Sequence, residues 1–135
     1  MYGTKYVVCK HSLILNFRLP KYNHMNTIKH CLCLDLKNDP DLIKAYEEHH
    51  KNVWPEVLQG LKDAGIHAAE IYRWSNRLFM ILETARDFSF ENKEKQDLNI
   101  PRILEWEDLM WKFQQSLPGV ENGSKWQQMK KIFTF

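Results

Sequence analysis

The order of strand and helix patterns along residues 28–135 is the feature that most constrains the fold of this chain. Short apolar runs suited to strands alternate with longer segments whose apolar residues recur at the helical period. We expect strands at 28–36, 67–74, 78–84 and 128–135, and helices at 40–64 and 100–116. The order is therefore β-α-β-β-α-β, and the nearly continuous apolar run at 78–84 indicates a central strand.

This order predicts an α+β fold, the ferredoxin-like βαββαβ sandwich, in which both helices pack on one face of an antiparallel sheet. The other face of such a sheet needs cover. A second copy of the chain commonly supplies it, in a two-fold dimer whose sheets form an α/β barrel. We therefore expect a homodimer with a pocket between the sheet and the helices of each subunit.

Proline and glycine mark the ends of the first predicted helix. Asp39 is suited to cap its start, with Pro40 at the first helical position, and Gly65 is suited to end it. Pro55 lies inside the helix and lacks the N–H that an interior position needs, so we expect a bend or a restart there. The charged segment 87–96 is predicted to be a loop or the frayed first turn of a helix.

The charge distribution argues against a nucleic-acid partner. Residues 1–30 hold five basic residues and no acidic one, so 14 of the 19 basic residues and all 17 acidic residues lie in 31–135. The folded part is thus mildly acidic and offers no basic stripe for a phosphate backbone. No run reaches the roughly 18–20 apolar residues that cross a bilayer, so no membrane partner is expected.

The three cysteines predict reduced thiols and no metal. Their number is odd, which favours packing residues in a reducing compartment, and we expect a cytoplasmic protein. Cys31 and Cys33 are spaced to lie on one side of a strand. They have no second cysteine pair that would complete a tetrahedral zinc site.

Residues 1–24 differ from the rest of the chain because they have no acidic residue and no clear period. We interpret them as an N-terminal extension, disordered or not native, that precedes a single α+β domain at residues 25–135. The short apolar run at 12–17 is too brief for a secretory signal, and no small-residue cleavage site follows it.

One face of the first predicted helix brings together a phenol, an imidazole and an indole. Tyr46, His50 and Trp54 are spaced by four residues, so they lie above one another on the helix. The same face carries Ile43, Val57 and Leu61, and an apolar face is expected to point inward. From these residues alone, His50 is either a packed core histidine or a proton-transfer group beside a pocket.

The block Tyr46-Glu47-Glu48-His49-His50-Lys51-Asn52-Val53-Trp54-Pro55-Glu56 resembles the Y-x-x-x-H-x-x-x-W-P-E block of the L-rhamnose mutarotase family. Further landmarks follow in the same order as in the family, and the resemblance covers about residues 28–135. They are Gly65-Ile66-His67, Ile71-Tyr72, Trp111-Lys112-Phe113, Leu117-Pro118 and Ile132-Phe133.

The resemblance implies an isomerase that interconverts the α and β anomers of a 6-deoxy-L-hexose, with no cofactor and no metal. It places His50 at the proton-transfer position and Tyr46 at a sugar-binding position. Trp111 corresponds to one member of a sugar-binding tryptophan pair, and Met110 stands where the other member is expected. A further sugar-contacting tyrosine is replaced by Ala69, so L-fucose is as admissible a substrate as L-rhamnose.

For several side chains the sequence allows either a structural role or a functional one. Trp54 either braces the bend at Pro55 or contacts the sugar, and Trp106 is expected to pack while Trp111 faces the pocket. A second acid or base is sought among carboxylates expected to point inward, namely Asp35, Glu70 and Glu107. Trp74 and Trp126 are expected to be packing or dimer contacts.

Two other classes of function stay open from the sequence. A cofactor-independent dimeric α/β-barrel oxygenase also combines histidine, tryptophan and asparagine in its pocket. A non-catalytic dimerisation or binding module would use His50 and Tyr46 for packing alone.

Overall fold

The protein is described by a computed structural model that covers residues 26–135, so the predicted extension at 1–24 lies outside the described residues. The strands are β1 (Thr27–Leu36), β2 (Ile66–Trp74), β3 (Arg77–Ala85), β4 (Gln114–Gln115) and β5 (Gln127–Gln128). The helices are α1 (Pro40–His49), α2 (Pro55–Asp63), α3 (Phe90–Asp97) and α4 (Pro101–Trp111). No helix in this part of the chain is long and apolar enough to cross a bilayer.

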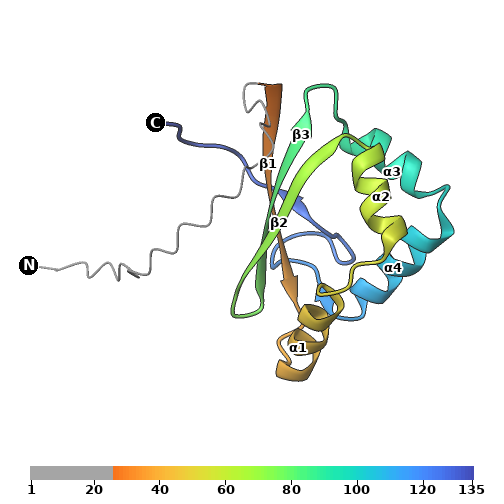
Figure 1. Ribbon diagram of the computed structural model, residues 1–135. Helices are drawn as coiled ribbons and strands as arrows, with labels where there is room; N and C mark the ends of the chain where they lie inside the picture. The colour runs from red at the N-terminus through yellow and green to blue at the C-terminus, as the bar shows by residue number, and fades with distance from the viewer. Residues whose placement is uncertain (1–25) are drawn as a thin grey trace, which may run out of the picture.

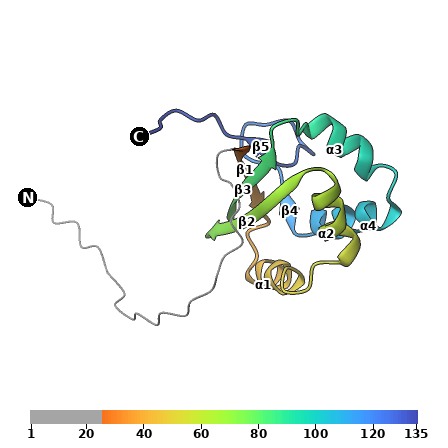
Figure 2. The ribbon, with the colours of Figure 1, turned by 45° about the horizontal axis from the view of Figure 1, so that its top comes forward.

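The five strands form one antiparallel sheet in the order β2-β3-β1-β4, and β5 also pairs with β1. The four helices lie on one side of this sheet (Figures 1 and 2). The predicted α+β architecture is therefore confirmed, and β3 has the central place that its apolar run predicted. Within residues 26–135, β2 forms an edge of the sheet because it pairs only with β3.

The segment predicted as helix at 40–64 is two helices, so the restart expected at Pro55 is confirmed. α1 begins as predicted, because the Asp39 side chain accepts hydrogen bonds from the backbone N–H groups of Asp41 (2.9 Å) and Leu42 (3.1 Å). It ends at His49, with His50 as its C-cap. The chain then restarts as α2, with Pro55 at the first turn, where its missing N–H costs nothing.

Three other boundaries differ from the predictions. The charged segment predicted as a loop or a frayed first turn contains α3, which begins at a capping side chain: Ser89 Oγ accepts from the N–H of Asn92 at 3.3 Å. α4 ends at Trp111, and the following residues turn into the short strand β4. The strand predicted at 128–135 is reduced to β5, and the tail beyond it leaves Ile132 90% exposed.

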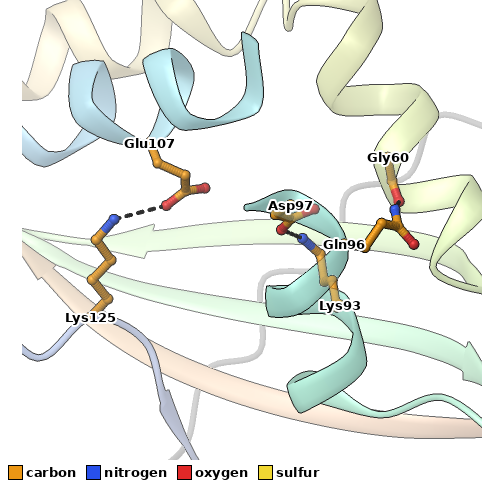
Figure 3. A network of polar contacts seen from close by, with 6 residues as sticks. All are labelled: Gly60, Lys93, Gln96, Asp97, Glu107 and Lys125. Carbon is orange, nitrogen blue, oxygen red and sulfur yellow. Dashed lines mark hydrogen bonds and ion pairs between the residues drawn. The ribbon is translucent and has the colours of Figure 1, made fainter. Parts of the chain in front are cut away.

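Polar contacts hold α3 against its neighbours (Figure 3). The side-chain amide of Gln96 donates to the backbone carbonyl oxygen of Gly60 at 3.1 Å and so joins α3 to α2. Lys93 and Asp97 form an ion pair within α3. Elsewhere in the same view, Lys125 Nζ lies 3.1 Å from Glu107 Oε2 and joins the loop before β5 to α4.

The core lies between the sheet and the helices, in two clusters. The larger cluster joins β1, β3, α1 and α4 and consists of Leu36, Tyr46, Leu78, Trp106, Met110 and Phe113. The smaller one lies nearer the other end of the sheet and consists of Leu32, Ile66 and Leu82. Despite the break at 50–54, the predicted inward face is largely kept, because Ile43, Tyr46, Trp54 and Val57 all belong to the larger cluster or pack against it.

The sheet face away from the helices we call the open face. Because side chains alternate along a strand, the pairings of β1, β2 and β3 place one set of residues on it. This set includes Lys29, Cys31, Cys33, Asp35, Ala68, Glu70, Tyr72, Trp74, Arg77, Phe79, Ile81 and Glu83. Five of these twelve residues are charged and the others are cysteine, aromatic or aliphatic, and Trp74 is 85% exposed.

Candidate active site

A cleft of about 390 Å³ opens between α1 and the edge strand β2. Its walls are built from Tyr46, Glu47 and His50 on the helix side, and from Ile71, Tyr72, Arg73 and Leu78 on the sheet side. Two of the sequence-predicted site residues, His50 and Tyr46, are thus brought together beside a cavity. His50 therefore lines a cavity and is not enclosed in the hydrophobic core.

The imidazole of His50 is oriented by the end of α1. Its Nδ1 atom lies 2.9 Å from the carbonyl oxygen of Tyr46, one helical turn earlier. A carbonyl oxygen can only accept, so Nδ1 carries the proton and donates it to this bond. In the neutral ring Nε2 is then an acceptor, and within residues 26–135 no hydrogen bond occupies it.

The surroundings of His50 favour the neutral ring. Burial lowers the pKa of His50 below its ordinary value of 6.5, because desolvation penalises the charged form. The bond to the Tyr46 carbonyl acts in the opposite direction, and the charge of the neighbouring His49 lowers the pKa further. The imidazole is therefore uncharged and able to accept a proton at neutral pH.

Tyr46 lies directly against His50, with the two ring centroids 4.3 Å apart. The residue is 3% exposed, and burial raises the pKa of its phenol to about 12. The side chain of Gln114 opposes this shift in pKa, yet no contact to the hydroxyl meets the geometry of a hydrogen bond. Within residues 26–135 the buried hydroxyl therefore has no hydrogen-bond partner.

An aromatic wall supports the imidazole from behind. The ring of Trp106 on α4 lies 5.7 Å from that of His50, with an edge-to-face geometry, and 5.3 Å from that of Trp54. The guanidinium carbon of Arg102 lies 3.9 Å from the Trp54 ring centroid, a cation–π contact. The position of the catalytic candidate is therefore set by packing between α1 and α4 as well as by its own helix.

The remaining sequence-predicted contacts lie outside the cleft. Trp54 is the N-cap of α2 and packs against the core, and Met110 is buried in the larger core cluster. Trp111 ends α4, where Lys125 Nζ lies 5.9 Å from its ring centroid. None of the three lines the cleft beside His50, and their contact with a sugar stays a prediction.

The three carboxylates proposed as a second acid or base are engaged elsewhere. Asp35 is buried and accepts two hydrogen bonds from Arg77, at 2.8 and 3.1 Å, on the open face. Glu70 accepts from the Tyr72 hydroxyl, and Glu107 pairs with Lys125. The carboxylate that does line the cleft is Glu47, paired with Arg73.

Sequence reasoning missed Glu47 and Arg73. Glu47 adjoins Tyr46 in the conspicuous block, but helical spacing alone turns it away from the inward face. Arg73 is 26 positions further along the chain, so only the packing of α1 beside β2 brings the two together. In the described part of the chain, no group of three or more His, Cys, Asp or Glu residues could hold a metal ion.

Comparison with known proteins agrees with this architecture. Residues 29–135 match the L-rhamnose mutarotase family. An L-fucose mutarotase of Xanthomonas campestris pv. campestris is 44% identical over 105 residues, which cover 76% of this chain and 84% of the relative. A UPF0734 protein of Dictyostelium discoideum is 38% identical over 104 residues, covering 74% of this chain and 83% of the relative.

A solved structure has the same fold. The crystal structure of an L-rhamnose mutarotase from Formosa agariphila aligns with a TM-score of 0.59, covering 80% of this chain and 98% of the other. Its sequence is 23% identical, so this likeness concerns the fold alone.

An antiparallel sheet covered by helices on one side, together with a family match over most of the chain, defines an isomerase of the mutarotase class. The chain belongs to the L-rhamnose mutarotase family. The resemblance drawn from the Tyr46–Glu56 block is confirmed, and a purely non-catalytic module and an oxygenase are set aside.

Proposed function

We propose that this protein interconverts the α and β anomers of a 6-deoxy-L-hexose, L-rhamnose or L-fucose, with His50 as the proton-transfer group. One observation carries the proposal: a neutral imidazole, with its Nδ1–H held by the Tyr46 carbonyl and its Nε2 unoccupied, lines a cleft of about 390 Å³. The names of the Xanthomonas and Formosa relatives support the choice of sugars.

The chemistry needs a group that both accepts and donates a proton near neutral pH. In ring opening, Nε2 takes the proton of the anomeric hydroxyl as that oxygen becomes the aldehyde oxygen. The bond between C1 and the ring oxygen breaks, and the ring oxygen takes up a proton. Because both oxygens are bonded to C1, the imidazolium just formed is close enough to supply that proton. Rotation of the aldehyde and the reverse steps then close the ring on its other face.

The surroundings of His50 suit this role. One positioned acid–base group contributes about 10²–10⁴ in rate. That is sufficient for a reaction that also proceeds without an enzyme. Tyr46 lines the cleft, but its hydroxyl is buried and has no hydrogen-bond partner within residues 26–135, so its role in sugar binding is proposed from the family resemblance. Trp54, Met110 and Trp111 remain proposed sugar contacts, Met110 and Trp111 because they stand at the family's tryptophan-pair positions, and none of the three lines the cleft.

We also propose that the protein acts as a homodimer formed through the open face. Tyr72 and Trp74 are 55% and 85% exposed there, which is unusual for large aromatic side chains of a monomer. An isologous contact between two open faces removes this surface from water.

Anomer exchange measured by NMR saturation transfer tests the activity. The assay uses wild-type protein with L-fucose, L-rhamnose, their D-enantiomers and L-galactose. We expect exchange faster than in buffer for one or both 6-deoxy-L-sugars. Exchange rates equal to those in buffer for every sugar would overturn the proposal, and faster exchange only for D-sugars would overturn the assigned substrate class.

A further inference from the structure

An ion pair between Arg73 and Glu47 lines the same cleft as His50. Arg73 lies on the helix side of the edge strand β2, because it pairs with the buried Leu78. Its guanidinium Nε donates to Glu47 Oε1 on α1 at 2.5 Å, and its Nη1 donates to the Ser75 carbonyl at 2.7 Å. The pair therefore bridges the two elements that form the walls of the cleft.

Both partners keep hydrogen-bonding capacity for a ligand. A guanidinium has five N–H groups and a carboxylate has about four acceptor sites. Within residues 26–135 the contacts to Glu47 and Ser75 use only two of those N–H groups. The side chains of Arg73 and Glu47 are 36% and 48% exposed, so water or a ligand can reach the rest.

This arrangement matches neighbouring hydroxyl groups. Each hydroxyl donates one hydrogen bond and accepts others, so two adjacent hydroxyls can accept from a guanidinium and donate to a carboxylate beside it. The charges of Arg73 and Glu47 cancel, which suits an uncharged ligand better than an acidic one. The nearby sheet wall is apolar, since Ile71 and Leu78 line it, and it can receive the parts of a sugar that carry no hydroxyl.

A purely structural role explains this pair poorly. Exposed ion pairs contribute little to stability, because water already solvates both charges. A hydrogen bond from a charged group to a ligand is stronger than one between neutral groups, and the cleft gives Arg73 a place to make it.

We infer that Arg73 and Glu47 are specificity-determining residues that bind two neighbouring hydroxyls of the sugar while its anomeric carbon lies at His50. This inference rests on the proposed function, because it assumes that the cleft binds a neutral monosaccharide.

The first test separates binding from turnover. Arg73→Met keeps the aliphatic stem and removes the donors, and we expect it to raise KM about tenfold while kcat changes less than twofold. Glu47→Gln is a second variant, expected to raise KM in the same direction. Lys95→Met is the matched control, because it removes a cation from the exposed Lys95–Glu91 pair on α3, which has no part in the cleft. Melting temperatures should stay within about 4 °C of wild type for all three.

The second test deletes hydroxyls from the sugar instead. Wild type and Arg73→Met are compared on L-fucose and on its 2-, 3- and 4-deoxy analogues, with binding measured by saturation-transfer difference NMR. For each hydroxyl bound by the pair, removing the hydroxyl and removing the Arg73 side chain should weaken binding by less than the sum of the two separate losses in binding free energy. The reason is that each change removes the same contact. For the remaining hydroxyl, which the pair does not bind, the two losses in binding free energy should be additive.

The results that would overturn the role of Arg73 and Glu47 differ from those that would overturn the proposed function. Additive losses at all three positions, or an unchanged KM in both variants, would overturn the inference while leaving the mutarotase activity intact. If wild type accelerates no exchange, the proposed function fails, yet binding of the analogues still decides whether Arg73 contacts hydroxyls. Absence of binding by wild type would overturn both.

Discussion

The Nδ1 atom of His50 lies 2.9 Å from the carbonyl oxygen of Tyr46, so the residue that packs against the imidazole also sets its tautomer. The carbonyl is in the last turn of α1, where it accepts the ordinary helical hydrogen bond from the backbone N–H of His50, at 3.3 Å. The side chain of His50 donates a second hydrogen bond to the same oxygen. These two bonds fix the imidazole at the end of α1 and leave Nε2 as the acceptor of the neutral ring.

His50→Asn should remove most of the acceleration of anomer exchange, by about 10²–10⁴. Asparagine keeps an amide N–H in the region of Nδ1 and can still donate to the Tyr46 carbonyl, but it cannot take up and return a proton near neutral pH. NMR saturation transfer measures the exchange rate, and circular dichroism checks that the fold is retained. A folded variant with the wild-type rate would contradict the assignment of His50.

The exchange rate should fall on acidification, with a midpoint below pH 6.5. Only the neutral imidazole accepts a proton, and burial lowers the pKa of His50, so the active form persists to a lower pH than for an unperturbed histidine. A rate that is flat from about pH 5 to pH 8 would show that another group carries the proton.

The same shift in pKa makes stability depend on pH. Between the lowered folded pKa and the unfolded value of 6.5, the unfolded chain binds more protons than the folded one. The free energy of unfolding therefore falls as the pH falls below 6.5. His30, whose pKa burial also lowers, contributes in the same direction. The difference in urea midpoint between wild type and His50→Asn should therefore change with pH in this window; a constant difference would contradict the shift assigned to His50.

The succession of strands and helices could be predicted because each signal is local. Pro40, Pro55 and Gly65 mark helix ends, and the apolar runs of β1 and β3 mark buried strands. α3 could not be predicted in this way, because it buries no residue and is held by Ser89 capping and side-chain pairs. The short β5 was overestimated because the apolar tail residues Ile132 and Phe133 have the pattern of a strand, yet no strand within residues 26–135 pairs with them.

Only the part of the site that lies within one helical turn could be predicted from the sequence. Tyr46 and His50 are four residues apart, so their proximity follows from the helix itself. The pairing of Glu47 with Arg73 and the edge-to-face contact of Trp106 with His50 depend on how α1 packs against β2 and α4. No periodicity in the sequence encodes those contacts between elements.

Gly60→Ala should destabilise the protein by about 1 kcal/mol. A Cβ atom at Gly60 would lie 2.6 Å from Cδ1 of Ile103, a buried residue of α4. Overpacking of this kind costs about 1–3 kcal/mol, and the better helix propensity of alanine offsets roughly 1 kcal/mol of it. Urea unfolding measures the loss.

The double variant Gly60→Ala/Ile103→Val provides the control for that prediction. Valine lacks the Cδ1 methyl that the new Cβ would meet, so the two changes together should cost less than the sum of their separate effects. Strictly additive losses would show that the close approach of α2 to α4 is not the cause.

Trp74→Lys should shift the proposed homodimer toward monomer. Trp74 ends β2 on the open face and is 85% exposed in the single chain, so a dimer through that face would bury a large aromatic surface that lysine cannot replace. Leu98→Lys is the matched control, because Leu98 is a 63% exposed apolar residue at the end of α3, on the helix side of the sheet. Light scattering coupled to size-exclusion chromatography, across a range of protein concentrations, gives the mass of each species. We expect wild type and Leu98→Lys to be dimers at concentrations where Trp74→Lys is a monomer. A monomeric wild type, or equal dissociation of the two variants, would contradict a dimer built on the open face.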